Sequence, residues 1–446
     1  AELELMGSTA WSKLFGNFTS QLMVTVPLEN GPQELPMSEI RNLAYDPDRE
    51  VRRRAYEAEL ATWAAAEVPL AAALNSIKGE VNALAKRRNW DSALDAALFQ
   101  NHIDRQTLDA MMEAAQESFP DFRRYLQAKA RALNLSVLSW FDIFAPLPTQ
   151  HREWRFEEAA DFIVDQFRTY SDRMAGLAQR AFQERWIDAE PRPGKRDGAF
   201  CMWIRKDESR ILSNFKPAYD GLRTLAHELG HAYHNLNLAD RTMLQRDTPM
   251  ALAETASIFC ETIIRHSAVA GSHPDEQIAI LEDSLQNACQ IVVDITSRYL
   301  FERDIFNKRI ERELSPQEFK DLILQAQQET YGEGLDPEAL HPYMWAVKGH
   351  YYSAGRSFYN YPYMFGLLFG LGLYAHYKDD AEAFKLGYDD LLSSTGMEDA
   401  ASLAARFGID IRDSAFWRSS LDIIRGDIDR FEALVAAQLG NPRPSS

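Results

Sequence analysis

The sequence is poor in cysteine, in basic clusters and in long apolar runs. Its three cysteines, an odd number at wide spacings, argue against a disulfide framework and favour a reducing compartment, so we expect a cytoplasmic protein. The net charge is −18 and no basic run exceeds three residues, so we expect neither nucleic acid nor an anionic membrane as a partner. The longest apolar run, YMFGLLFGLGLY at 363–374, is too short and too rich in glycine to span a bilayer, and we expect no membrane segment.

The sequence does contain enough apolar material for a large core. With 446 residues, 46% of them hydrophobic, the chain predicts a globular protein of two or three domains. Helical periodicity dominates, and a break at FAPLPTQ separates a predicted helical amino-terminal lobe over residues 1–150 from a second helical lobe over residues 151–446. Alternating apolar and polar residues around a polar turn predict one short β-hairpin between about 199 and 215. The predicted fold class is therefore mainly α.

The stretch TLAHELGHAYH, residues 224–234, contains a His-Glu-x-x-His motif. Residues four apart lie on one face of a helix, so His227 and His231 can direct their imidazoles at one point, as a tetrahedral zinc ion requires. Glu228 lies one position round, where its carboxylate can reach a water molecule on the metal. The alternative is a helix face that carries histidines without a metal. His234 is not needed for this geometry, and we expect it to be structural or to support the ligands.

A catalytic zinc of this type needs a third protein ligand and an open position for water. Glu254 is the best candidate, because it lies in the second turn of a helix predicted to begin at Thr248-Pro249, among small and apolar neighbours where a carboxylate needs a partner. Glu261 lies on the same face two turns along, where it can accept the N–H of a ligating histidine. The alternative for both is the polar stripe of an amphipathic helix, and Asp247 is a weaker candidate ligand.

The segment KGHYYSAGRSFYNYPYMFG, residues 348–366, contains five tyrosines, one histidine and three glycines. Tyrosine hydroxyls and a histidine can donate hydrogen bonds to a developing oxyanion, and the glycines give a loop the freedom to close over substrate. The alternative is a tyrosine-rich turn in the core.

Four separated segments together resemble the zinc oligopeptidases of the thimet oligopeptidase and oligoendopeptidase F family, and most closely the oligoendopeptidase F branch. They are TLAHELGHAYH (224–234), ALAETASIFCE (251–261), KGHYYSAGRSFYNYPYMFGLLFGLGLYA (348–375) and STGMEDAASLAARFGIDIRDSAFW (394–417). Looser similarity extends towards the start of the chain, so the resemblance covers nearly all of it.

The resemblance implies one Zn²⁺ ion per chain, held by His227, His231 and Glu254. It implies that Glu228 is the general base, which takes a proton from water and passes it to the leaving amine. Glu261 matches the glutamate that supports a ligand in the family.

The resemblance also implies that His350 and tyrosines after it stabilise the transition state. The spacing in HYYSAGRSFYNY fits neither common pattern of the family without a one-residue gap. We expect Tyr352 and Tyr361 to be the catalytic tyrosines, and Tyr359 to bind substrate.

The implied fold is a helical ellipsoid with a deep central channel that admits short unfolded peptides, and the predicted hairpin offers an edge strand to their backbone. The implied activity is hydrolysis of internal peptide bonds. Relatives carry about one more small helical domain before the point where this chain begins, so we expect the lobe 1–150 to lack it. Two alternatives remain open: an exopeptidase that trims carboxyl ends, and a zinc-containing protein that binds peptides without cleaving them.

Overall fold

The computed structural model describes residues 2–29, 31–147 and 152–440. Its helical content of 71% confirms the mainly α fold class. The predicted lobe boundary between residues 150 and 151 lies outside the described residues, and the two lobes stay a prediction.

The described residues form twenty α-helices and five strands. They are α1 (Glu2–Met6), α2 (Ser8–Thr19), α3 (Met37–Asn42), α4 (Arg49–Arg87), α5 (Ala93–Gln100), α6 (Arg105–Glu117), α7 (Phe119–Ala132), α8 (Phe156–Tyr170), α9 (Asp172–Gln183), α10 (Tyr219–Asn237), α11 (Met250–Ala253), α12 (Thr255–Gly271), α13 (Pro274–Cys289), α14 (Ile295–Glu311), α15 (Pro316–Tyr331), α16 (Met344–Val347), α17 (Tyr361–Asp379), α18 (Ala381–Ser394), α19 (Ala400–Ala405) and α20 (Ser414–Gly440). The strands are β1 (Met23–Leu28), β2 (Gly31–Pro36), β3 (Ile187–Asp188), β4 (Phe200–Arg205) and β5 (Glu208–Leu212).

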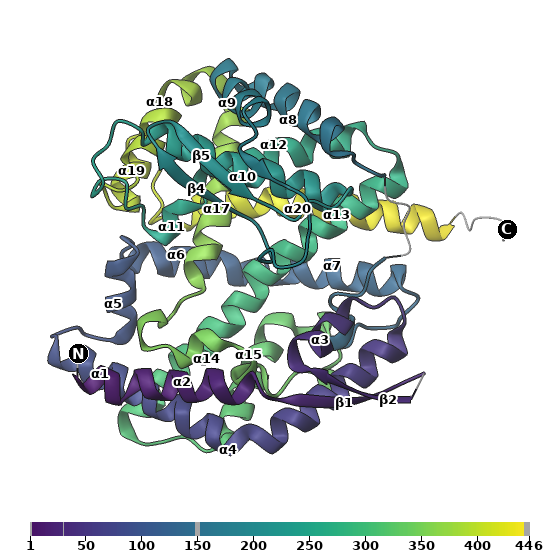
Figure 1. The fold of residues 1–446 in the computed structure, drawn as a ribbon, viewed down its shortest axis with the longest axis vertical. Helices are drawn as coiled ribbons and strands as arrows, with labels where there is room; N and C mark the ends of the chain where they lie inside the picture. Colours follow the sequence, from purple (N-terminus) through teal and green to yellow (C-terminus); the bar gives the residue numbers. More distant parts are fainter. Residues whose placement is uncertain (1, 30, 148–151, 441–446) are drawn as a thin grey trace.

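The ribbon has two halves along its long axis (Figure 1). The lower half holds α2, α4, α14 and α15, and the upper half holds α8–α10, α12 and α17–α20. Each half has an apolar core: the smaller core takes its buried side chains from 24–77 and 300–352, and the larger core takes nearly all of its own from 93–295 and 331–435. Helix α13, the π-helical turn η3 (Gln290–Asp294) and α14 form one continuous stretch that contributes to both cores.

Two small sheets accompany the helices. Strands β4 and β5 form the predicted antiparallel hairpin, with Cys201 opposite Ile211, and the two-residue β3 lies parallel to β5 on its other side. The β1–β2 hairpin was not predicted. Val24 and Val26 of β1 are buried at alternating positions, but β2 is polar and largely exposed, and its sequence GPQELP is typical of a loop.

By length and composition alone, the described residues include one helix that is able to cross a membrane, α4, whose most apolar window has a mean hydropathy of 1.2. In the structure, its Trp63, Leu70 and Ile77 are buried in the smaller core. Lys78, one residue further on, is 1% exposed and pairs with Glu302 of α14 at 2.6 Å. A core helix passes the same test of length and composition, so the test by itself assigns no membrane span.

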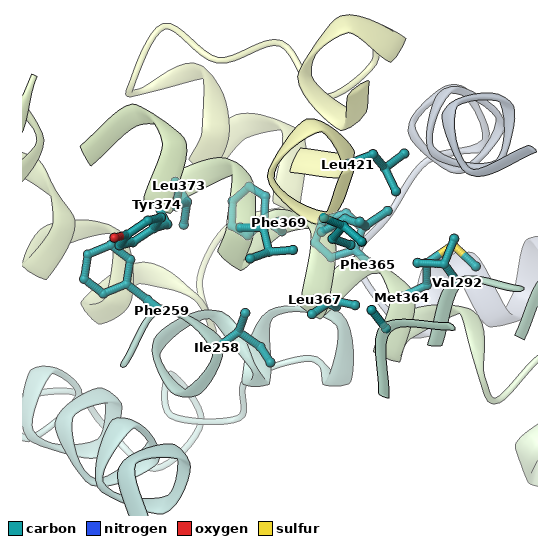
Figure 2. Close-up of a cluster of buried hydrophobic side chains, with 14 of the residues drawn as sticks. Ile258, Phe259, Val292, Met364, Phe365, Leu367, Phe369, Leu373, Tyr374 and Leu421 are labelled. Carbon is teal, nitrogen blue, oxygen red and sulfur yellow. The ribbon is translucent and has the colours of Figure 1, made fainter. Parts of the chain in front are cut away.

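The glycine-rich apolar run at 363–374 forms the middle of α17, which is buried on nearly all sides. Figure 2 shows α17 side chains packed against α12 and α20, with the labelled residues Ile258, Phe259, Met364, Phe365, Leu367, Phe369, Leu373, Tyr374 and Leu421. Gly366 is a point of close approach to the junction of α11 and α12, since a Cβ atom there would lie 2.8 Å from Cβ of Glu254. The absence of a side chain at Gly366 therefore lets α17 press on the residue predicted to be a metal ligand.

Helices α10 and α12 come into backbone contact at Gly230. A Cβ atom at this position would lie 2.5 Å from Cα of Ser257 and 2.7 Å from the carbonyl oxygen of Ala256. Backbone atoms cannot move aside as a flexible side chain can, so a larger residue must push the two helices apart. Gly230 lies within the His-Glu-x-x-His motif, and this contact sets the distance between the motif and α12.

Gly230→Ala is expected to lower the free energy of unfolding by at least about 2 kcal/mol, because the added methyl group has no space between the two backbones. Gly176→Ala is the matched control, since it lies at an exposed position inside helix α9 with no atom within 4 Å of an added Cβ. This control is expected to stabilise the fold by about 0.5–1 kcal/mol, as alanine does inside a helix. Urea unfolding of both variants measures the two changes, and equal stability of both would contradict the close contact at Gly230.

Candidate metal centre

Helix α10 presents His227 and His231 on one face, as their spacing of four residues predicts. The centroids of their rings lie 4.9 Å apart. Glu254 approaches from the junction of α11 and α12, so that its Oε2 lies 3.2 Å from Nε2 of His227 and 3.4 Å from Nε2 of His231. Among the residues that the structure describes, these three form the one group whose ligand atoms, all within 4.8 Å of one another, are able to hold a metal ion.

The spacing of these atoms fits a small divalent cation. Ligands at about 2.0–2.2 Å from a tetrahedral zinc ion lie about 3.3–3.5 Å from one another, close to the two distances measured to Glu254. Two imidazoles and one carboxylate are also a donor set typical of catalytic zinc. Asp247, the weaker candidate ligand, is not part of this group.

The sequence predicted Glu254 in the second turn of one continuous helix, but the structure does not contain such a helix. The helix is interrupted at this residue, which has φ −86° and ψ 0° and separates α11 from α12. The hydroxyl of Ser257 donates to Oε2 of Glu254 at 2.7 Å and to its backbone oxygen at 3.0 Å. These bonds, together with the contact at Gly366, hold the carboxylate towards α10.

Glu261 accepts a hydrogen bond from His227 at 3.1 Å, through Nδ1 of the ring. The bond leaves Nε2 of His227 to face Glu254, and it fixes the ring orientation, as carboxylates beside metal ligands commonly do. Arg223 lies 3.5 Å from Glu261 and 3.0 Å from Asp283 of α13, so it balances part of the negative charge. Glu261 therefore lies where the sequence predicted it, behind a candidate ligand.

The carboxylates control which histidine carries a proton. Burial alone lowers the pKa of His227, but hydrogen bonds to Glu254 and Glu261 outweigh this effect and raise the pKa to about 10. Burial lowers the pKa of His231 to about 4, so this ring is neutral. Burial alone raises the pKa of Glu254, but the two histidines hold it at about 2. A metal ion at this centre must therefore displace one proton, from His227.

Glu228 is buried beside the ligand group, with 5% of its surface exposed. Its Oε2 has no hydrogen-bond partner among the described residues. Burial raises the pKa of Glu228 to about 7, and the charge of Glu254 adds to the increase while His227 opposes it. A buried carboxylate without a partner is costly for stability, and a pKa near neutrality lets it both accept and return a proton.

His234 lies on the same helix but is not a member of the ligand group. Its Nε2 is 2.9 Å from the hydroxyl of Thr395 and 3.2 Å from the backbone oxygen of Leu392, and its side chain is buried. It thus connects α10 to the end of α18. Its predicted support of the ligands stays a prediction.

Two of the predicted catalytic tyrosines lie in packed surroundings. The ring of Tyr352 stacks on Phe15 at 3.9 Å in the smaller core, where its hydroxyl is buried without a partner in the described chain. The hydroxyl of Tyr361 donates to the backbone oxygen of Ala97 in α5 at 3.2 Å, and the side chain is 1% exposed. Both side chains are taken up by packing, so neither hydroxyl lies at the metal centre.

A tyrosine that the sequence analysis missed, Tyr363, lies close to the centre instead. Burial and the neighbouring Tyr359 raise its pKa, and the charge of Glu254 adds to the increase. Tyr363 is three residues before Gly366 on α17, on the helix face that meets Glu254, and this spacing was the available signal. Its hydroxyl is 2.9 Å from that of Tyr359, whose ring lies 5.9 Å from His350. His350, Tyr359 and Tyr363 therefore form a continuous row that ends near Glu254.

A strained residue precedes this row. Phe358 has φ +54°, a left-handed conformation that bulky side chains rarely adopt. Its ring is 4% exposed and packs against Tyr299 and Phe306, which holds the backbone in place. The strain costs about 1–2 kcal/mol and turns the chain so that the next residue, Tyr359, leaves the core. The ring of Tyr359 lines a pocket of about 420 Å³ with Asp247 and Arg356.

Comparison with known proteins agrees with this geometry. The sequence model of peptidase family M3 matches residues 42–423. The chain is 25% identical to oligoendopeptidase F, chromosomal, of Lactococcus lactis subsp. cremoris over 391 residues, which are 87% of this chain and 64% of that protein. It is 24% identical to group B oligopeptidase PepB of Streptococcus agalactiae serotype III over 411 residues, 92% of this chain and 68% of that protein.

Solved structures share the fold. The crystal structure of oligoendopeptidase-F from Enterococcus faecium superposes with a TM-score of 0.77 at 19% identity, over 97% of this chain and 73% of that chain. A chain from Chlamydophila abortus superposes with a TM-score of 0.86 at 23% identity, over 96% and 72%. The chain spans 64–65% of the length of the first three curated relatives it matches.

Zinc binding at about pH 8 is expected to release about one proton per ion, because His227 is protonated in the metal-free protein and the metal takes the same nitrogen. Zinc affinity should therefore rise with pH until His227 loses its proton unaided, near pH 10. Titration calorimetry in two buffers of different ionisation enthalpy counts the protons. Glu261→Gln removes a negative charge that helps to raise this pKa, and is expected to release fewer protons and to bind zinc about 10–100-fold more weakly. Proton-independent binding by the unmodified protein would contradict the pKa of His227.

Proposed function

Because the chain belongs to peptidase family M3, we propose that it is a zinc-dependent oligopeptidase, which hydrolyses internal bonds of short unfolded peptides. The observation that carries the proposal is Glu228, a buried carboxylate without a partner for Oε2 in the described chain, next to a three-ligand group of zinc type. Relatives named oligoendopeptidase F support the substrate class.

His227, His231 and Glu254 hold the ion in this proposal. When bound, zinc supplies Lewis acidity, which polarises a carbonyl group and makes water more acidic. Glu228 accepts a proton from the attacking water through the carboxylate oxygen that has no other partner. With a pKa raised by burial to about 7, the same group then delivers the proton to the leaving amine.

The row of His350, Tyr359 and Tyr363 supplies donors for the oxyanion. Burial and the neighbouring Tyr359 raise the pKa of the Tyr363 hydroxyl, so it stays protonated and able to donate at neutral pH. Burial and nearby cations lower the pKa of His350 to about 2, so its imidazole is neutral. Donors held in place before the reaction stabilise a developing negative charge without having to reorganise.

Strand β4 offers a place for the peptide backbone. It is the edge of the β3–β5–β4 sheet, and it packs next to α10, where the charge of Glu228 contributes to raising the pKa of Cys201. An extended peptide can pair with such an edge through main-chain hydrogen bonds. On β4, Phe200, Met202 and Ile204 are exposed on one face, 37%, 53% and 45% respectively. This apolar face favours substrates with apolar side chains at alternate positions.

Glu228→Gln tests the proposal directly. The variant is expected to keep its zinc, because Glu228 is not a ligand, and to lose at least about a hundredfold in kcat, because the amide cannot accept a proton. Zinc content by mass spectrometry and cleavage of a quenched peptide measure the two properties. Fragment masses distinguish internal cuts from stepwise trimming of the carboxyl end. A protein that binds peptide tightly without cutting it, or activity that survives Glu228→Gln, would contradict the proposal.

Tyr363→Phe is expected to lower kcat about a hundredfold through the loss of an oxyanion donor, with a small change in KM. Tyr361→Phe is the matched control on the same helix, since its hydroxyl donates to the backbone oxygen of Ala97 in α5. That control is expected to cost about 1 kcal/mol of stability and to leave kcat unchanged. Steady-state kinetics of both variants decides which tyrosine acts, and the opposite pattern would restore the assignment of Tyr361.

A further inference from the structure

A chain of four polar side chains leads from the π-helical turn η3 to His350. Asp294, the last residue of the turn, pairs with Arg298 one helical turn later, and both are largely buried. Nη1 of Arg298 donates to Oδ1 of Asn360 at 3.3 Å. Nδ2 of Asn360 lies 2.6 Å from Nε2 of His350. None of these residues except His350 has a role in the function proposed above.

The direction of each hydrogen bond follows from chemistry alone. A guanidinium group only donates, so the Asn360 atom that faces Arg298 must be the carbonyl oxygen. The amide nitrogen of Asn360 therefore faces His350, and an amide NH₂ only donates. Nε2 of His350 must then be the acceptor, with its lone pair free of a proton.

A neutral imidazole carries one N–H proton, either on Nδ1 or on Nε2. Burial and the cations Arg298, Lys78 and Lys348 keep the pKa of His350 far below neutrality, so the ring is neutral. In the part of the chain that the structure describes, Nδ1 of His350 makes no hydrogen bond, and the side chain is half-buried. With Nε2 committed as an acceptor, the proton resides on Nδ1.

The side chain of Asn360 contacts His350 and does not cap α17. It is the N-cap residue of α17, where an asparagine side chain usually accepts a hydrogen bond from the first turn, yet it makes no such bond. A π-helical turn is likewise a costly departure from the α-helix that is frequent at functional sites. The unused cap of α17 and the π-helical turn thus both accompany the hydrogen bonds that orient the amide of Asn360.

We infer that Asn360 and Arg298 are positioning residues that fix the proton of His350 on Nδ1, so that this histidine donates to the substrate and cannot accept from it. The other tautomer presents a bare lone pair at Nδ1, which repels an oxyanion. The inference rests on the proposed function for the use of the proton, but the location of the proton is a property of the protein itself.

Nitrogen-15 NMR of the metal-loaded protein with labelled histidine reads the tautomer directly. The chain has ten histidines, and the signal of His350 is identified by its loss in His350→Gln. In the unmodified protein we expect Nδ1 to carry the proton and Nε2 to carry none. A proton on Nε2 would overturn the inference, whatever the activity of the protein.

Asn360→Asp is the decisive variant, because it keeps the shape and turns the donor that faces His350 into an acceptor. Nε2 should then acquire a proton, and kcat should fall at least about tenfold while KM changes less than about twofold. Asn82→Asp is the matched control: its amide donates to the backbone oxygen of Phe306, and we expect unchanged His350 signals. An unchanged tautomer in Asn360→Asp would overturn the role of Asn360.

Asn360→Leu keeps the volume and removes both hydrogen bonds, so it serves if the charged variant does not fold. The His350 signals should then report exchange between both tautomers, and a tautomer still fixed on Nδ1 would overturn the inference. Failure of the proposed function looks different: the unmodified protein would keep its proton on Nδ1 but would cleave no peptide.

Discussion

The backbone contact between α10 and α12 at Gly230 is the constraint on which the rest of the site depends. It brings the His-Glu-x-x-His motif within reach of Glu254 and Glu261, which lie 27 and 34 residues after His227. Because backbone atoms form the contact, the separation of the helices does not depend on side-chain rotamers. Helix α17 adds a second contact from another side, at Gly366. The two glycines, Gly230 and Gly366, thus allow the close helix contacts that set the positions of the three candidate ligands.

The same closeness explains the charge state of the centre. Three carboxylates, those of Glu228, Glu254 and Glu261, converge on two imidazoles in a buried place. Arg223 offsets Glu261, and protonated His227 offsets Glu254, whereas burial raises the pKa of Glu228 and His227 opposes this rise only in part. In the proposed function a divalent cation at this centre would favour the ionised form of Glu228 as well, so the metal and the base would act as one electrostatic unit.

The helical part of the site could be predicted from the sequence, and the loop part could not. A period of 3.6 residues relates His227 to His231, and Glu254 and Glu261 follow as carboxylates in apolar surroundings. No such period governs 349–358, where two short 3₁₀ turns and the left-handed Phe358 decide which tyrosines leave the core. Tyr352 and Tyr361 were therefore chosen by spacing, and the structure places both in packed surroundings. Tyr363 was missed although it shares a helix face with Gly366, because the glycine was interpreted as a source of loop freedom and as an obstacle to membrane insertion, and not as a helix contact.

The two apolar cores divide the functional groups between them. The ligand triad belongs to helices of the larger core, whereas His350 lies between Tyr351 and Lys348 in a segment that packs in the smaller one. Asn360, at the start of α17, contacts His350 where the two cores meet. The continuous helical stretch α13–η3–α14 contributes side chains to both cores. The contact between Asn360 and His350 therefore depends on how the segments of the two cores pack together, and in the proposed function the oxyanion donor and the metal ligands stay in register only while this packing holds.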